Sequence, residues 1–415
     1  MSANFLHGVE TITIESGGKP IRVVKSAVIG IVGTAPIQSV LEADRTINKP
    51  VLLLNELAAV KYFGAETAGY TLPTALKAVF KKGAATVVAI NVFDPATHLT
   101  EAEPDPTAVT NAELIGTVDA GGNRTGMQAW LNSYALFGFK PKILIAPGYS
   151  TIPAIRTELE ALADRLHAIQ YSDVPAGTTV QAAIEGRGPS GTVNLNTSSR
   201  RTMLFYPHLQ VYDAVTNDIA LQPYSSFAAG IRAWKDIEYG YWWSGSNTQI
   251  DGIVGIERPL TAEINDPTSE VNMLNEVGIT TVFNSYGTGF RTWGNRSAAW
   301  PSETGPEVFE CIMRTGDGIG ESIEYSMLQF IDRPLNGALI DAICESVRGF
   351  QRKLIGDGAI LDGTCWYDPA DNPKEELALG HLTLRYDFMP PTPMERLTFK
   401  RTLNLEYLKN LGGDQ

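Results

Sequence analysis

The residues that most resemble a chemical site are a pair of carboxylates and a glycine-rich stretch. Asp236 and Glu238 stand two positions apart beside Tyr239, where an acid pair could be imagined. Side chains at that spacing do not share a helix face, so we expect structural ion pairs there rather than acid–base catalysis. The stretch Gly316–Gly320 matches neither the dinucleotide-binding nor the P-loop pattern and follows no strand–helix opening, so we expect a turn.

Histidine, serine and cysteine form no catalytic or metal-binding pattern. No GxSxG elbow and no HExxH spacing occur. The three cysteines are too few and too widely spaced for a disulfide framework, and we expect them to be buried small hydrophobes in a reducing compartment. We expect the five histidines on the surface or on helix faces: they are His7, His98, His167, His208 and His381. The sequence therefore predicts no enzyme activity, no cofactor and no metal.

Four basic side chains are candidates for contacts. Arg296 follows Trp293 and is interpreted either as one half of an ion pair across a domain seam or as an exposed turn residue. The other three, Arg348, Arg352 and Lys353, lie on one predicted helix, where most such faces are merely solvated.

Length and charge limit the classes of protein. A chain of 415 residues is expected to form two or three domains. Its net charge of −13 argues against binding to a phosphate backbone, so no nucleic-acid partner is predicted. The start lacks a basic stretch followed by an apolar core, and the apolar runs are far shorter than the roughly 20 residues that cross a bilayer. We expect a soluble protein made in the cytoplasm, without membrane insertion.

Residues 21–265 alternate predicted strands and helices, which is typical of an α/β domain with a largely parallel sheet. The predicted strands are Ala27–Val32, Val51–Leu54, Thr86–Phe93 and Lys142–Ala146. The predicted helices are Thr71–Gly83, Gly126–Phe137 and one capped by Ser150 or Thr151, with an apolar stripe that reaches Ile169. Glycines at 30 and 33 in the first strand indicate close backbone approach or a turn.

Residues 266–392 follow a different pattern and predict a smaller α+β domain. Its expected elements are a helix at Glu270–Asn275, a hairpin of Ile279–Phe283 and Phe290–Trp293, a helix at Ala338–Ile355 and an alternating strand at Leu382–Phe388. The fold class is therefore α/β plus α+β, in several domains.

Both ends of the chain are strand-like and are separated from the body by breakers. Residues 1–20 carry one such segment, with Val9, Thr11, Ile12 and Ile14, and residues 393–415 carry the other, with Leu397, Phe399, Leu403 and Leu405. A lone strand must pair with an edge, either by folding back onto its own sheet or by adding to a neighbouring copy. The second alternative gives head-to-tail contacts that do not close, and hence a helical array.

Several stretches together resemble phage tail sheath proteins of short contractile phages and R-type pyocins. They are FLHGVE (5–10), AVIGIVGTAP (27–36), SSFAAG (225–230), DIEYGYWWSGSN (236–247), IDGIVG (250–255), GTGFRTWGNR (287–296), ESIEYSML (321–328) and GDGAILDG (356–363). Their order and spacing are more specific than any one of them.

The resemblance implies a structural subunit of a contractile tail sheath. Such subunits form hexameric rings in a helical homopolymer around an inner tube, between baseplate and tail terminator proteins. Contraction then drives the tube through a bacterial envelope during genome delivery or killing. Residues 21–265 would be the outer domain and 266–392 the inner domain facing the tube, with Arg348, Arg352 and Lys353 as its contact. The location would be a virion tail or an extracellular contractile particle, assembled in the host cytoplasm.

Two alternatives remain open. A soluble α/β enzyme would bind its ligand at the carboxyl ends of the strands, but the sequence offers no catalytic constellation for it. A component of a related secretion-type sheath or of a baseplate is the other.

Overall fold

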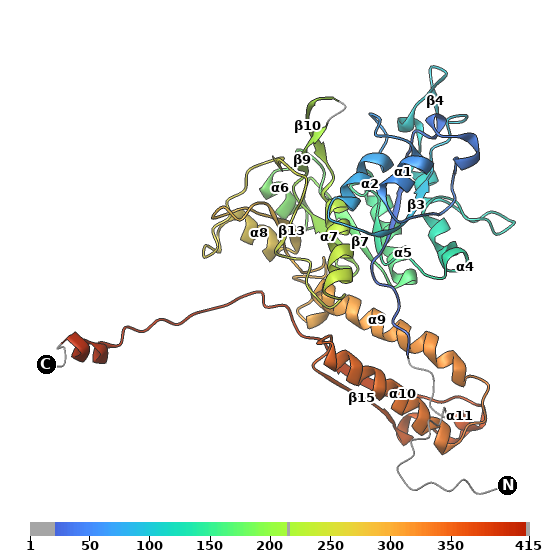
Figure 1. Cartoon of the computed structure of the whole chain (residues 1–415), viewed down its shortest axis with the longest axis vertical. Coiled ribbons are helices and arrows are strands. Elements are labelled where there is room, and N and C mark those ends of the chain that lie inside the picture. Colours follow the sequence, from blue (N-terminus) through green and yellow to red (C-terminus); the bar gives the residue numbers. More distant parts are fainter. Residues whose placement is uncertain (1–20, 214–215, 412–415) are drawn as a thin grey trace, which may run out of the picture.

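The computed structural model describes residues 21–213 and 216–411, which form a large body, a small body and an extended C-terminal segment (Figure 1). The predicted N-terminal segment with Val9, Thr11, Ile12 and Ile14 lies outside the described residues. Among the described residues, no helix is both long and apolar enough to span a bilayer.

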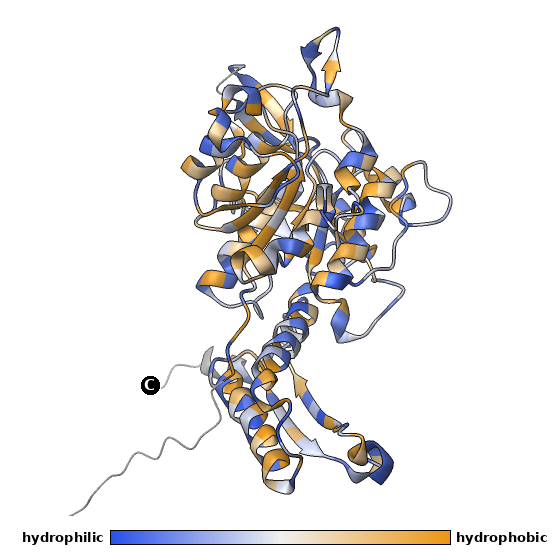
Figure 2. Cartoon of the chain, turned by 90° about the vertical axis from the view of Figure 1, so that its right-hand side faces the viewer, coloured by the Kyte–Doolittle hydropathy of each residue, from blue (hydrophilic) through white to orange (hydrophobic). Residues whose placement is uncertain are grey.

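The large body is built on a nine-stranded sheet. Its strands from one edge to the other are β2 (Val51–Leu53), β3 (Thr86–Asn91), β1 (Val28–Gly33), β6 (Ile143–Ile145), β7 (Ile169–Asp173), β8 (Thr202–Phe205), β13 (Ile279–Phe283), β14 (Arg291–Trp293) and β11 (Thr248–Gln249). The neighbours from β3 to β13 all run parallel, as predicted. Because helices cover both faces, these strands appear as continuous apolar runs, and Figure 2 shows the apolar sheet enclosed by helices.

The helices of the large body are α1 (Glu56–Phe63), α2 (Leu72–Phe80), α3 (Asn111–Ile115), α4 (Ser133–Phe137), α5 (Pro153–Leu166), α6 (Val180–Glu185), α7 (Tyr224–Glu238) and α8 (Glu270–Glu276). Glycines in β1 let neighbouring segments approach the strand closely: a Cβ at Gly30 would lie 3.0 Å from Trp130 of the 3-10 helix η4 (Gly126–Asn132), and one at Gly33 would collide with Thr71, the N-cap of α2. These two positions face opposite sides of the strand. The prediction of close approach at both glycines is confirmed.

The large body also contains two small sheets. One is the pair β4 (Leu99–Thr100) and β5 (Glu103–Pro104), and the other contains β10 (Asp218–Gln222), β9 (Leu209–Asp213) and β12 (Gly255–Ile256).

The small body contains two long helices and a hairpin. Its elements are α9 (Glu310–Met327), α10 (Gly337–Gly356), β15 (Asp362–Tyr367), α11 (Lys374–Ala378) and β16 (Leu384–Met389). Val347, Phe350 and Leu354 on one face of α10 meet Ile319 of α9 in a separate apolar core. The predicted helix and alternating strand of this region are confirmed, and β16 pairs antiparallel with β15.

Several predictions differ from the structure. The predicted boundary between 265 and 266 falls inside the large body, because β13 joins the sheet through β8 and β14 follows it. The predicted turn at Gly316–Gly320 is wrong, since these residues lie within α9. Residue Ile169 belongs to β7, not to the stripe of α5, whose N-cap is Ile152 rather than Ser150 or Thr151. All three cysteines are buried, as expected.

Candidate assembly interface

The C-terminal segment is the most exposed part of the described chain. After β16 it leads away from both bodies without regular structure until the short 3-10 helix η8 (Leu405–Leu411) (Figure 1). The predicted apolar face of this segment is open to solvent: its side chains are Leu397 at 61%, Phe399 at 85%, Leu403 at 82% and Leu405 at 74% exposure. In the single chain these residues do not fold back onto the sheets, and the predicted strand is not formed because no edge lies beside it.

The hairpin of the small body offers unpaired edges. β15 and β16 form a sheet with each other alone among the described residues, so each strand keeps one free edge of backbone groups. α10 covers one face of this hairpin through Val347 and Cys365, which belong to the same core. An open edge held on a rigid support is a template for an additional strand.

The first described residues and the start of the C-terminal segment both lie beside the small body. Ile21 is buried in its core, and the backbone N–H groups of Arg22 and Val24 donate to Ser326 Oγ and Ser322 Oγ of α9 at 3.2 and 3.1 Å. At the other end, Pro390 follows β16 directly. Ile21 and Pro390 therefore lie on the same body as the open hairpin.

Arg296 forms an ion pair with the start of the C-terminal segment. Its guanidinium binds both carboxylate oxygens of Glu395, with Nε at 2.9 and 3.1 Å, and stacks on Trp300 at 3.7 Å. The residues before Glu395 pass beside a cleft of about 640 Å³ whose other lining includes Trp242, Trp243 and Trp293. The predicted partner across a seam is thus an acidic residue of the C-terminal segment, in a clasp that we call the arm clasp (Arg296 and Glu395).

The basic residues of α10 do not act alike. Arg348 donates from Nε to the carbonyl oxygen of Cys365 in β15 at 2.8 Å, so part of its side chain supports the hairpin. Arg352 pairs with Glu345 at 2.5 Å on the exposed face. Lys353 is exposed in the last turn of α10. Arg352 and Lys353 are therefore the pair available to an external partner.

Asp236 lies in a buried ionic cluster rather than a catalytic pair. Its carboxylate accepts from Arg232 Nη2 at 2.5 Å and from Arg314 at 2.6 and 2.9 Å. Burial alone would raise the pKa of Asp236, but the two guanidinium groups outweigh it and hold the pKa below its ordinary value of 3.8. Glu238 is exposed and lies outside the cluster. The predicted structural role of Asp236 is confirmed.

Buried polar side chains lie at the carboxyl ends of β7 and β1. Asp173, at the end of β7, accepts from Ser225 Oγ at 2.5 Å and Ser150 Oγ at 3.2 Å, and all three residues are buried. Burial raises the pKa of Asp173. At the end of β1, the Thr34 N–H donates to Thr71 Oγ1 at 3.1 Å. These hydroxyl groups hold loops and helix ends together at these two strand ends.

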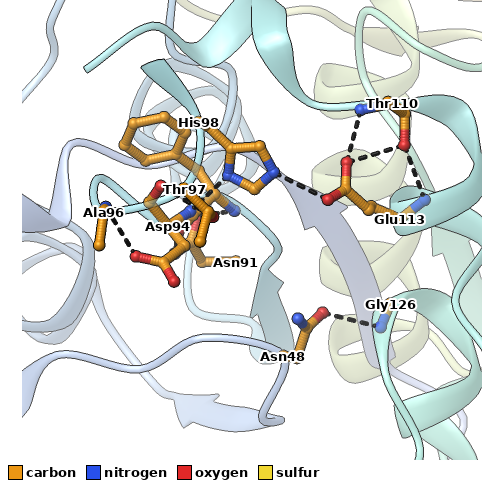
Figure 3. Close-up of polar contacts among 10 residues, drawn as sticks. Asn48, Asn91, Asp94, Ala96, Thr97, His98, Thr110, Glu113 and Gly126 are labelled. Atoms are coloured by element: carbon orange, nitrogen blue, oxygen red, sulfur yellow. Dashed lines mark hydrogen bonds and ion pairs between the residues drawn. The ribbon is translucent and has the colours of Figure 1, made fainter. Parts of the chain in front are cut away.

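His98 is buried, contrary to the prediction of a surface or helix-face position. Figure 3 shows its ring between two partners: Nδ1 accepts from the Asp94 N–H at 2.9 Å, and Nε2 faces Glu113 Oε1 at 3.0 Å. The carboxylate of Glu113 also caps α3 through Thr110. The His98 ring therefore joins the loop at Asp94 to the first turn of α3. Across the described ranges 21–213 and 216–411, no group of three or more His, Cys, Asp or Glu could hold a metal ion.

The charged face of α9 was not predicted from the sequence. Glu310, Arg314, Asp317 and Glu321 recur every three or four residues and all contact the large body. A helical period was present, but it was carried by charged residues and interrupted by glycines, so it did not appear as an amphipathic helix.

The chain resembles known proteins over its whole length. Models of the phage tail sheath protein central domain and the phage tail sheath C-terminal domain match residues 122–298 and 308–404. The tail sheath protein of Burkholderia phage BcepMu is 48% identical with 100% of both chains covered. That of Escherichia phage P2 is 30% identical over 99% of this chain and 98% of the relative. The contracted PVC sheath complex of an extracellular contractile injection system shares the fold, with a TM-score of 0.68 at 14% identity, covering 98% of this chain and 99% of that one.

Proposed function

Because this chain belongs to the phage tail sheath family and is a structural subunit of a contractile sheath, we propose that its copies polymerise around an inner tube and drive it through a bacterial envelope. The resemblance predicted from the sequence is confirmed. Two observations carry the proposal: the exposed C-terminal segment is apolar on one face and pairs with no other described strand, and the β15–β16 hairpin keeps free edges. The proposed sheath subunit acts without catalysis or cofactor, in a virion tail or extracellular contractile particle assembled in the host cytoplasm.

Strand addition between copies would link the sheath. The C-terminal segment of one copy supplies the alternating face of Leu397, Phe399, Leu403 and Leu405, and the β15–β16 hairpin of another supplies the edge. The N-terminal segment with Val9, Thr11, Ile12 and Ile14 would do the same from the other end. Main-chain hydrogen bonds give the affinity and alternate side chains the register. Because such contacts are head-to-tail, each copy can bind the next one along the sheath. The assembly therefore grows as a helix and does not stop at a single closed ring.

The large body would lie outside and the small body would face the tube, with the baseplate and tail terminator at the ends of the cylinder. The exposed Arg352 and Lys353 of α10 suit an acidic tube surface, because basic and acidic patches attract and orient each other. The proposed outer part therefore extends beyond residues 21–265, since the hairpin of β13 and β14 belongs with the large body. The proposed inner part is correspondingly smaller than residues 266–392. With a net charge of −13, nucleic acid is not proposed as a partner.

Electron microscopy of the purified chain, with and without tube protein, tests the function directly. Striated cylinders are expected. Discrete globular particles under every condition would contradict it, and would favour the baseplate or enzyme alternatives.

Reversing the charge of the tube-facing pair should block assembly on tubes. In the double variant Arg352→Glu and Lys353→Glu we expect at least about tenfold fewer sheathed tubes, since like charges across an interface are repelled. The monomer should keep its thermal midpoint, because both side chains are exposed. Arg348 is left intact because it supports β15. Lys374→Glu, on α11, is the control; equal loss in both variants, or none in either, would show that the contact is elsewhere.

The arm clasp should set how readily copies polymerise. Replacing Glu395 by Gln removes a bidentate pair and frees the base of the C-terminal segment. A partly exposed pair contributes about 1 kcal/mol at most, so we expect up to about a fivefold rise in the concentration needed for polymerisation and little change in monomer stability. Light scattering measures the first and urea unfolding the second. Glu406→Gln makes the same charge change further along the segment and should polymerise normally; identical curves for both variants would show that the clasp is unimportant.

A further inference from the structure

The contact between the two bodies includes a stripe of charged side chains on α9, which lies between them (Figure 1). Glu310, Arg314, Asp317 and Glu321 follow one another at helical spacing, so they share one face of the helix. Glu310, Arg314 and Glu321 are buried and Asp317 is half-buried. A face of this kind would be solvated on an isolated helix. Here it is turned toward the large body.

The first two members of the stripe meet the interior of the large body. The hydroxyl of Tyr171 in β7 donates to Glu310, and burial raises the pKa of this tyrosine well above its ordinary range. Arg314 binds both oxygens of Asp236 at the end of α7 and donates to the Ser26 carbonyl oxygen at 3.0 Å. These contacts tie α9 to one strand and one helix of the large body.

The last two members meet side chains at the edge of the same body. Asp317 accepts from both terminal nitrogens of Arg201 at 2.6 and 3.0 Å. Lys142 places its ammonium 2.6 Å from Glu321 and also donates to the Leu166 carbonyl oxygen at 2.7 Å. Every charge of the stripe therefore has a fixed partner.

The opposite face of α9 is small and apolar. Ile319 is in the core of the small body, and a Cβ at Gly316 or Gly320 would stand 3.7 Å from Phe388 or Tyr386 of β16. These two rings of the hairpin therefore lie against this face of the helix. By its apolar face α9 belongs to the small body, and by its charged face it is joined to the large one.

The order of the charges excludes neighbouring registers. Moving α9 forward by one turn would set Glu310 against Asp236 and Arg314 against Arg201. Moving it backward would set Asp317 against Asp236. The forward shift brings together two pairs of like charges and the backward shift one pair, and like charges at buried positions such as Asp236 are costly. An apolar seam would carry no such penalty, because apolar contacts are not directional.

We propose that Glu310, Arg314, Asp317 and Glu321 are positioning residues that lock a single register between the two bodies, so that they move as one piece. The consequence rests on the proposed function: a push on the large body during contraction reaches the small body, and hence the tube, without slip at α9.

Hydrogen exchange on the unassembled full-length chain tests the lock. In Asp317→Arg, α9 faces Arg201 with a like charge, so we expect amides of α9, α10 and the hairpin to exchange at least about tenfold faster, with the large-body sheet unchanged. The double variant Arg201→Asp with Asp317→Arg restores an opposite pair and should slow this exchange again. Asp164→Asn removes the exposed partner of Arg201 that is not on α9, and should leave exchange in both bodies unaltered.

Three results would overturn the proposal. Asp317→Arg could leave amide exchange unchanged, or it could accelerate amide exchange equally in both bodies. The third is amide exchange in the double variant that is no slower than in Asp317→Arg alone. Because no polymer is needed for these measurements, they do not depend on whether sheaths form. Absence of sheaths from a wild-type chain with a normal lock would instead count against the proposed function.

Discussion

A chain that ends at Glu395 should fold normally and form no sheath. The residues removed, 396–415, carry side chains that are largely exposed where they are described, such as Phe399 at 85%. Their loss therefore takes little buried surface from the monomer, and the thermal midpoint should move by no more than a degree or two. If these residues supply the strand that joins copies, polymerisation should fall below detection. Circular dichroism measures the first result and electron microscopy the second.

A matched pair of full-length variants separates the strand from the mere presence of a tail. Replacing Leu397, Phe399 and Leu403 by serine removes the face that would pack on a neighbouring hairpin, and should abolish sheaths as the truncation does. Replacing Thr398, Thr402 and Asn404 by alanine changes the alternate face and should be tolerated, because alternate side chains of a strand point to opposite sides. Normal sheaths from the truncated chain would end the account of strand addition at this terminus.

The parallel sheet was predictable because its strands are buried on both faces and so appear as short apolar runs, as in β1 and β3. The hairpin of β13 and β14 was predicted as a local unit but assigned to the wrong body. Its membership depends on the pairing of Ile279 with Leu204 in β8, a contact across some 75 residues that no local pattern carries.

The site was predictable only in part, for a related reason. Arg296 was identified from its type and position, but its partner Glu395 lies 99 residues away. The helix α9 was missed because its charged face is buried and its glycines at 316, 318 and 320 resemble a turn. The C-terminal alternation was visible, yet a strand needs an edge beside it, and in the single chain this segment pairs with no described strand. The sequence pattern thus indicated the candidate residues, but only the folded structure showed which residues contact each other.

The largest loss of monomer stability is expected from Asp236→Ala. The carboxylate is fully buried between Arg232 and Arg314, so its removal leaves two guanidinium groups without their partner. Removing one member of a buried ionic group costs about 3–5 kcal/mol, a large share of the 5–15 kcal/mol that is usual for folding. Urea unfolding measures it. Glu238→Ala, two residues on and exposed, should change the free energy of unfolding by less than about 0.5 kcal/mol.

The pH dependence of the same residue has a definite sign. Because the folded state holds the pKa of Asp236 below 3.8, its ionised form stabilises the fold at every pH above that value. As pH falls below about 3.8 and through the folded pKa, the carboxylate takes up a proton and the stabilisation is lost. The stability gap between the wild type and Asp236→Asn should therefore be constant from pH 5 to 8 and narrow on acidification. A gap that stayed constant down to pH 2, or that was below about 1 kcal/mol at neutral pH, would show that the cluster around Asp236 does not hold α9 against α7.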